Sequence, residues 1–276
     1  MLCKVMEKII RDVLIYYMEE NGFFTKHQHG FRKGRSCATQ LIEVMEQWTE
    51  DLDKKNSIDV IYLDFQKAFD TVPHKRLIHK FKGYGISGNL LLWIEDFLHE
   101  RKQRVVLNGQ SSSWTEVISG IPQGSVLGLI LFTIYINDLP DALENMIKLF
   151  AYDTKVFATV NNEEDKNSLQ GDIDKLMNWL DTWLLKFNKS KCKHMHLGPE
   201  TDYNYMMEEN TIANTMEEKD LDIIIDNKLN FQNHINKQVN KANQKLGLIR
   251  DRPFNLKWGV MVFCFVPNFF FGPHKS

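Results

Sequence analysis

Residues 59–70, DVIYLDFQKAFD, decide how the rest of the chain is organised. Val60 to Leu63 form a short, mostly apolar run rich in β-formers, which predicts a strand buried on at least one face. The run ends in a carboxylate, Asp64, and a charge beside buried apolar surface is costly unless it is solvated or paired. Asp64 is therefore either a solvated residue just past a strand or a ligand for a metal ion at the edge of a sheet.

Composition is that of an ordinary globular protein. The 276 residues suffice for one large domain or for two or three subdomains, and 43% of them are apolar and 25% charged. Lys+Arg 34 and Asp+Glu 36 give a net charge of -2, so binding to nucleic acid would require a local basic patch. The four cysteines form no C-x-x-C pair, which favours a reduced, intracellular protein over a disulfide framework.

No signal peptide or membrane span is expected. Residues 2–17 place apolar side chains on one face of a helix and charged side chains on the other, which is typical of a surface helix. The apolar run 260–271 is interrupted by Pro267 and is shorter than the roughly 17 residues that a membrane span needs. We therefore expect no membrane association.

A basic, glycine-containing loop precedes the central strand. Residues 28–36 read QHGFRKGRS, and Ser36 can cap the helix expected to run to about Lys54. Backbone N–H groups at a helix start, together with Arg32 and Arg35, suit an anionic or phosphate ligand. A solvated basic loop is the alternative.

Helices and short strands alternate after the central strand. Asn108-Gly109 between two β-forming runs predicts a hairpin, and residues 146–158 predict two strands joined by a tight turn at Tyr152-Asp153. No periodicity is visible after Arg252. Further elements follow from apolar spacing: helices at 74–83, 88–100, 125–138, 165–187 and 231–250, and strands at 193–197, 203–207 and 221–225.

Five motifs, which follow one another along the chain in the family's order, resemble the reverse transcriptase domain of non-LTR retrotransposons. Residues 64–70 look like its first catalytic motif, and residues 121–127, IPQGSVL, look like its template and nucleotide loop. Residues 150–154, FAYDT, occupy the place of the family's aromatic-Ala-Asp-Asp hairpin. The loop 28–36 is similar to its fingers motif, and the region behind the hairpin is represented by Trp183, Phe187-Asn188 and Lys191-Cys192.

The resemblance implies an α+β fold, the right-hand polymerase palm, in which an antiparallel sheet is backed by helices. It also implies partial fingers and a rudimentary thumb. The expected division is partial fingers at 1–57, the first palm motif at 58–74, a fingers insertion at 75–118, palm with a primer-grip-like segment at 119–227, and a rudimentary thumb with an aberrant tail at 228–276.

The activity implied is RNA-directed DNA polymerisation, the addition of deoxynucleotides to a primer 3′ end. The implied partners are an RNA template, a DNA primer and deoxynucleoside triphosphates, with Mg²⁺ as cofactor. Asp64 and Asp153 would be the catalytic carboxylates and the ligands of a two-ion site.

The resemblance also implies a nucleotide-binding surface. Phe69 would be the aromatic side chain that excludes a ribonucleotide 2′-hydroxyl group, and Gln123 and Gly124 would line the nascent base pair. The expected contacts to the triphosphate are Arg32, Arg35 and Lys191.

Tyr152 is the main departure from the family pattern. It stands where the family has the first of two adjacent aspartates, and it contributes a neutral phenol with an ordinary pKa near 10. Leu129 replaces a usual proline, and Asp222 replaces a usual glycine. We expect a weakened metal site and impaired polymerisation; the alternative is a catalytically inactive remnant that at most binds nucleic acid or a protein partner.

Cys192, His194 and His196 alternate along one predicted strand and could bind zinc. Structural zinc sites usually have four protein ligands, and no second cluster supplies a fourth. We therefore do not expect a zinc site from this pattern.

Overall fold

The computed structural model describes residues 2–199 and 203–250. The chain divides into two compact units after Thr215. Within the described part of the chain, none of the helices is long and apolar enough to span a bilayer. The tail after Arg252, singled out above as aberrant, lies outside the described residues.

A five-stranded sheet is the framework of the first unit. The strand order is β11-β8-β1-β7-β6, and neighbours are antiparallel except that β11 runs parallel to β8. The central strand is the apolar run singled out from the sequence, and all six of its residues are buried. The strands are β1 (Ile58–Leu63), β6 (Met146–Phe150), β7 (Asp153–Thr159), β8 (Lys193–Leu197) and β11 (Ala213–Asn214).

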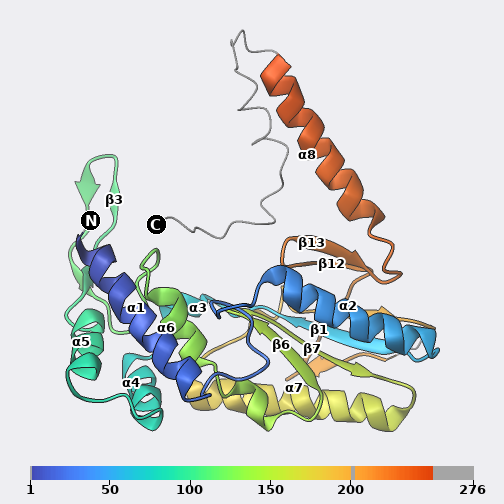
Figure 1. Ribbon diagram of the computed structural model, residues 1–276, viewed down its shortest axis with the longest axis horizontal. Helices are drawn as coiled ribbons and strands as arrows, with labels where there is room; N and C mark the ends of the chain where they lie inside the picture. Colours follow the sequence, from blue (N-terminus) through green and yellow to red (C-terminus); the bar gives the residue numbers. More distant parts are fainter. Residues whose placement is uncertain (1, 200–202, 251–276) are drawn as a thin grey trace. The chain divides into compact units, whose positions relative to one another are not determined.

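Helices cover both faces of this sheet, with α2 (Cys37–Asp53) on one side and α7 (Glu163–Trp183) on the other (Figure 1). Trp48 of α2 packs edge-on against Phe157 of β7, with ring centroids 5.6 Å apart. Burying an apolar side chain of this kind stabilises the fold by roughly 1.5–3 kcal/mol. The prediction of an α+β fold with an antiparallel sheet backed by helices is confirmed. From α7 the core receives Leu169, Ile173, Leu176 and Leu180.

A second group of helices gathers at one end of the sheet (Figure 1). The helix α6 is apolar on all sides and almost completely buried, whereas α1 buries only a narrow stripe that includes Leu14 and Met18. Ile9 and Val13 of α1 are exposed, so its apolar face is only partly used. The bounds are α1 (Leu2–Glu20), α3 (Ala68–Thr71), α4 (His74–Gly83), α5 (Gly88–Leu98), α6 (Gly128–Tyr135) and the 3₁₀ helix η1 (Leu139–Ala142).

The hairpin predicted at Asn108-Gly109 is present. These two residues have φ angles of 51° and 80° and connect β3 to β4, as expected for the two-residue turn that suits strand twist. A second pair of strands continues the hairpin away from the turn. The strands are β2 (Lys102–Gln103), β3 (Val106–Leu107), β4 (Gln110–Ser111) and β5 (Thr115–Glu116).

The remaining strands are short. The first unit ends with the pair β9 (Met206–Met207) and β10 (Asn210–Thr211) before β11. The second unit contains the antiparallel pair β12 (Glu217–Asp220) and β13 (Ile223–Asp226), followed by α8 (Gln232–Arg250). The part of the range 119–227 expected to resemble a primer grip includes this β12–β13 hairpin, which belongs to the same compact unit as α8.

Candidate functional site

Strand pairing brings Asp64 and Asp153 to the same end of the sheet. In the β1–β7 ladder Leu63 pairs with Thr154, so the register continued by one residue places Asp64 opposite Asp153. Asp153 pairs with Phe150 on β6, which leaves Ala151 and Tyr152 as the turn, one residue earlier than the sequence indicated. The two acids expected to act together thus lie at the neighbouring ends of β1 and β7.

Tyr152 occupies the tip of this hairpin and is 41% exposed. Its ring contacts Phe69 edge-on, with centroids 5.7 Å apart. Burial, followed by the negative charges of Asp153 and Asp64, raises the pKa of the phenol above its usual value. The phenol is therefore neutral at pH 7 and lies within electrostatic reach of both carboxylates.

A cavity of about 460 Å³ opens beside Tyr152. The predicted site residues Asp64, Phe69, Gln123, Gly124 and Lys191 line it, whereas Asp153 and the two arginines are not among the lining residues. Further lining residues are Phe65, Lys67, Ala68, Pro122, Ser125, Gly128, Leu129 and Tyr152. The cavity therefore combines segments from four of the five sequence motifs.

Polar contacts orient two of the lining side chains. Nζ of Lys191 lies 3.5 Å from Oδ2 of Asp64, and because these side chains are 64% and 38% exposed the pair contributes about 1 kcal/mol or less. Nε2 of Gln123 donates a hydrogen bond of 2.9 Å to Oδ1 of Asp70. The amide of Gln123 is thereby held at the cavity wall.

Glu7 holds the loop that carries Gln123 and Gly124. Its Oε2 accepts hydrogen bonds from the backbone N–H groups of Val126 (2.6 Å) and Leu127 (3.4 Å), just before α6 begins. A carboxylate satisfies the unpaired N–H groups at a helix start and interacts favourably with the helix dipole. Glu7 was not identified from the sequence, since its partner lies more than a hundred residues away.

Arg32 and Arg35 are engaged in the structure of their own loop. Arg32 forms a bidentate ion pair with Glu19 of α1, at 2.9 and 2.8 Å, and donates to the carbonyl oxygen of Thr25. The side-chain hydrogen bonds from Arg32 lower the pKa of Glu19. Arg35 donates to the carbonyl oxygen of Lys26 at 2.6 Å. The expected contact of both arginines with a triphosphate stays a prediction.

Gln28 connects the same loop to the hairpin that carries Tyr152. The side chain is completely buried, and its Oε1 accepts from the backbone N–H groups of Gly30 (2.7 Å) and Ala151 (3.0 Å). Ala151 has φ of 55°, in the left-handed region that costs an alanine roughly 1 kcal/mol. A Cβ atom on Gly30 would come within 3.0 Å of the Ala151 nitrogen, so only glycine fits there. The motif 28–36 was recognised in the sequence, but the contact of Gln28 with Ala151 was not.

A second group of potential ligands converges on the sheet itself. Among the residues that the structure describes, Asp59, His194 and His196 form a group able to hold a metal ion, and Cys192 is not part of it. Burial raises the pKa of the Cys192 thiol to about 11, which disfavours the thiolate. The alternating pattern in the sequence therefore identified two of the three potential ligands, His194 and His196. It wrongly included Cys192 and missed Asp59, which lies on another strand.

Comparison with known proteins agrees with these features. The family described as "Reverse transcriptase (RNA-dependent DNA polymerase)" matches residues 1–244. The RNA-directed DNA polymerase from mobile element jockey of Drosophila melanogaster is 30% identical over 245 residues, which are 85% of this chain and 27% of that protein. The probable RNA-directed DNA polymerase from transposon BS of the same species is 26% identical over 297 residues, covering 98% of this chain and 32% of that protein. The chain thus spans about a quarter to a third of these relatives.

Solved structures show the same fold. Apo telomerase from Candida tropicalis, truncated from its C-terminal domain, aligns with a TM-score of 0.56 over 81% of this chain and 44% of that chain. Their sequences are 11% identical, so this likeness concerns the polymerase fold alone.

Proposed function

The chain belongs to the reverse transcriptase family, and from this premise we propose that it is the polymerase domain of a non-LTR retrotransposon with activity impaired at the catalytic hairpin. The observation that carries the proposal is the β1–β7 register, which brings Asp64 and Asp153 to the same end of the sheet. The cavity beside them supports it, since its lining comes from the motifs expected to hold a nucleotide. The proposed reaction is the addition of deoxynucleotides to a primer 3′ end on an RNA template.

The carboxylates fit the cofactor of this reaction only in part. Mg²⁺ prefers oxygen ligands and is often held by one or two carboxylates together with water, which Asp64 and Asp153 can supply. Bound Mg²⁺ would supply activation of the primer hydroxyl and neutralise charge on the departing pyrophosphate. With Tyr152 in the third position, the residues present two negative charges where the family pattern has three.

The other cavity residues would position the nucleotide. Phe69 lies between Phe132 and Tyr152, with ring centroids 5.5 and 5.7 Å away, and these contacts support its proposed role in excluding a 2′-hydroxyl group. Gln123, held by Asp70, would contact the nascent base pair. The Lys191 ammonium group, beside Asp64, would attract the triphosphate.

The expected impairment follows from electrostatics. Opposite unit charges about 4 Å apart attract by roughly 4 kcal/mol at an effective dielectric constant near 20. Since about 1.4 kcal/mol corresponds to a tenfold change in rate, absence of one carboxylate lowers activity by about a hundredfold or more. The Tyr152 ring also occupies space next to the cavity.

Primer extension with Mg²⁺ on an RNA template tests the proposal. We expect weak or no extension by the natural chain, a gain of about a hundredfold or more in Tyr152→Asp, and no comparable gain in Tyr152→Phe, which removes the hydroxyl without adding charge. Asp64→Asn in the Tyr152→Asp background should abolish the gain. Efficient extension that is unaffected by Asp64→Asn would refute the assignment.

The second candidate is a catalytically inactive remnant that binds nucleic acid, and Tyr152 is the observation that favours it. Its mark is template–primer binding that weakens with rising salt, without extension by either Tyr152 variant. If Tyr152→Asp by itself restores extension, the other site residues are functional, and the hypothesis of an inactive remnant is excluded for them.

A further inference from the structure

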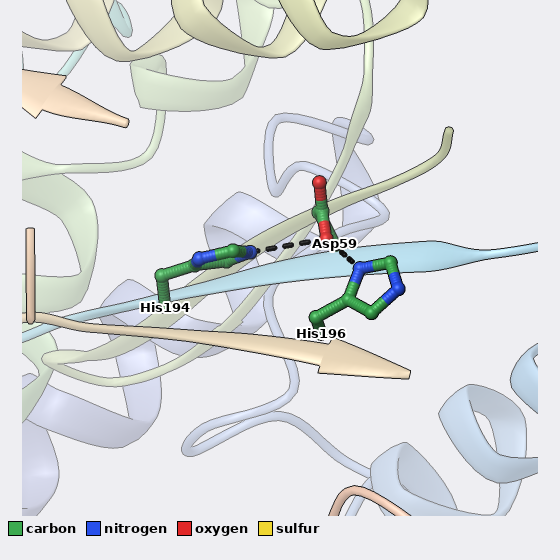
Figure 2. A group of neighbouring side chains, drawn as sticks. All are labelled: Asp59, His194 and His196. Carbon is green, nitrogen blue, oxygen red and sulfur yellow. Dashed lines mark hydrogen bonds and ion pairs between the residues drawn. The ribbon is translucent and has the colours of Figure 1, made fainter. Parts of the chain in front are cut away.

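Asp59, His194 and His196 converge on the face of the sheet opposite to that of Asp64. In the β1–β8 ladder Asp59 pairs with His196, and His194 lies two residues earlier on the same strand and therefore on the same face. Figure 2 shows both imidazole rings directed at the Asp59 carboxylate. Oδ1 of Asp59 lies 3.0 Å from Nε2 of His194 and 2.6 Å from Nδ1 of His196.

The cluster is buried and carries a negative charge at its centre. The side chains of Asp59, His194 and His196 are 0%, 5% and 17% exposed. The hydroxyl of Tyr205 donates to Oδ2 of Asp59 at 2.6 Å, which leaves Oδ1 facing the histidines.

The outer nitrogen of each histidine faces an acceptor. Nδ1 of His194 lies 2.8 Å from Oδ1 of Asn214, and Nε2 of His196 lies 2.6 Å from the carbonyl oxygen of Pro199. Nδ1 of His196 donates to Oδ1 of Asp59 in the absence of an ion, and binding of a metal would release that proton while the outer nitrogens keep their partners. Histidines that bind metals are oriented by hydrogen bonds of this kind.

Nε2 of His194 gives a second, independent indication of a ligand. This atom is buried and lies 3.0 Å from Oδ1 of Asp59, in an ion-pair contact whose angles are not those of a hydrogen bond. Buried polar atoms nearly always have well-aligned partners, and an ion between His194 and Asp59 would replace this poorly aligned contact.

We propose that Asp59, His194 and His196 bind a transition-metal ion of the Zn²⁺ type. Two imidazole nitrogens and one carboxylate oxygen suit Zn²⁺ and related ions, whereas Mg²⁺ prefers oxygen ligands, so this site is distinct from the carboxylate pair at the hairpin. Metal–ligand bonds of about 2.0 Å separate tetrahedral ligands by about 3.3 Å. The carboxylate therefore needs to move by less than about 1 Å, and solvent entering beside His196 supplies the fourth ligand.

Such an ion would connect β1 to β8 at the end of the central strand remote from Asp64. It would bind the folded chain and not the unfolded one, and so would raise the thermal unfolding temperature in a zinc-dependent manner. Its role would be structural and independent of polymerisation.

Titration of the full chain with ZnCl₂, by calorimetry and by equilibrium dialysis in Mg²⁺-free buffer, tests the site. We expect one equivalent of zinc to bind, and His194→Gln and His196→Gln each to lose it. Asn214→Leu, which removes the partner of the outer nitrogen of His194 together with a 3.4 Å hydrogen bond to Asn204, should weaken zinc binding by about 10–100-fold. His79→Gln, at an exposed histidine on α4, serves as the matched control and should bind as the natural chain does.

Cobalt substitution keeps the test decisive even if a variant fails to fold. We expect visible absorption of four-coordinate Co²⁺ with nitrogen and oxygen ligands in the natural chain. An intense thiolate charge-transfer band would assign the metal to cysteine and overturn the proposal. Absence of zinc binding at micromolar concentration would also overturn the proposal. Asp59, His194 and His196 would then form a hydrogen-bonded cluster without a metal.

Discussion

Gln28→Met removes the connection between the loop 28–36 and the hairpin that carries Tyr152, with little change in side-chain volume. Two backbone N–H groups, of Gly30 and Ala151, lose the oxygen that accepts from them. A buried donor left without a partner costs roughly 1–3 kcal/mol, so we expect the free energy of unfolding to fall by about 2–5 kcal/mol.

Gln40→Met is the matched control. Gln40 is buried like Gln28 and donates through Nε2 to the carbonyl oxygen of Leu149 at 2.9 Å. That oxygen also accepts from the backbone N–H of His29 at 2.8 Å, so it keeps a partner in the variant. The expected loss is about 1 kcal/mol, the net contribution of one ordinary hydrogen bond.

Urea unfolding followed by tryptophan fluorescence measures both losses, since Trp48 is fully buried against the sheet of the first unit. The slope of the transition should stay constant, so that a change in midpoint reports a change in stability. Equal losses in the two variants, or no loss in Gln28→Met, would show that the Gln28 oxygen does not satisfy these N–H groups and would refute the reasoning.

Three further changes test other contacts. Gly30→Ala should lower the free energy of unfolding by about 3 kcal/mol in urea, because the added Cβ collides with the backbone of Ala151; unchanged stability would contradict that close approach. Burial lowers the pKa of Lys80 to about 8 against the opposing charge of Asp138. The unfolded chain, with a lysine pKa near 10.4, then holds this proton more tightly, so thermal stability should rise from about pH 8 to pH 10, and Lys80→Met should flatten the rise. Glu7→Ala should destabilise the chain by about 1–2 kcal/mol in thermal unfolding and Glu7→Gln by less, since the amide oxygen still accepts from the N–H groups before α6; identical effects would argue against capping.

Local patterns determined the framework well. The apolar run at Val60 predicted a central buried strand, and Asn108-Gly109 predicted the hairpin that joins β3 to β4. Both predictions succeeded because strand burial and turn geometry depend on a few consecutive residues. The helix at 2–17 was also predicted, but the sequence did not show which residues of its apolar face are buried. Ile9 and Val13 are exposed, since the periodicity of a helix shows which residues share a face and not how much of that face another element covers.

The sequence by itself determined the order of the motifs, the end of the central strand at Asp64, and the phenol of Tyr152 in the place of an acid. Only the tertiary structure decided that Arg32 is paired with Glu19, that Gln28 supports Ala151, and that Asp59 lies between His194 and His196. The physical reason is separation along the chain: Asp59 and His196 meet through the register of two strands 137 residues apart. No local periodicity encodes such a register.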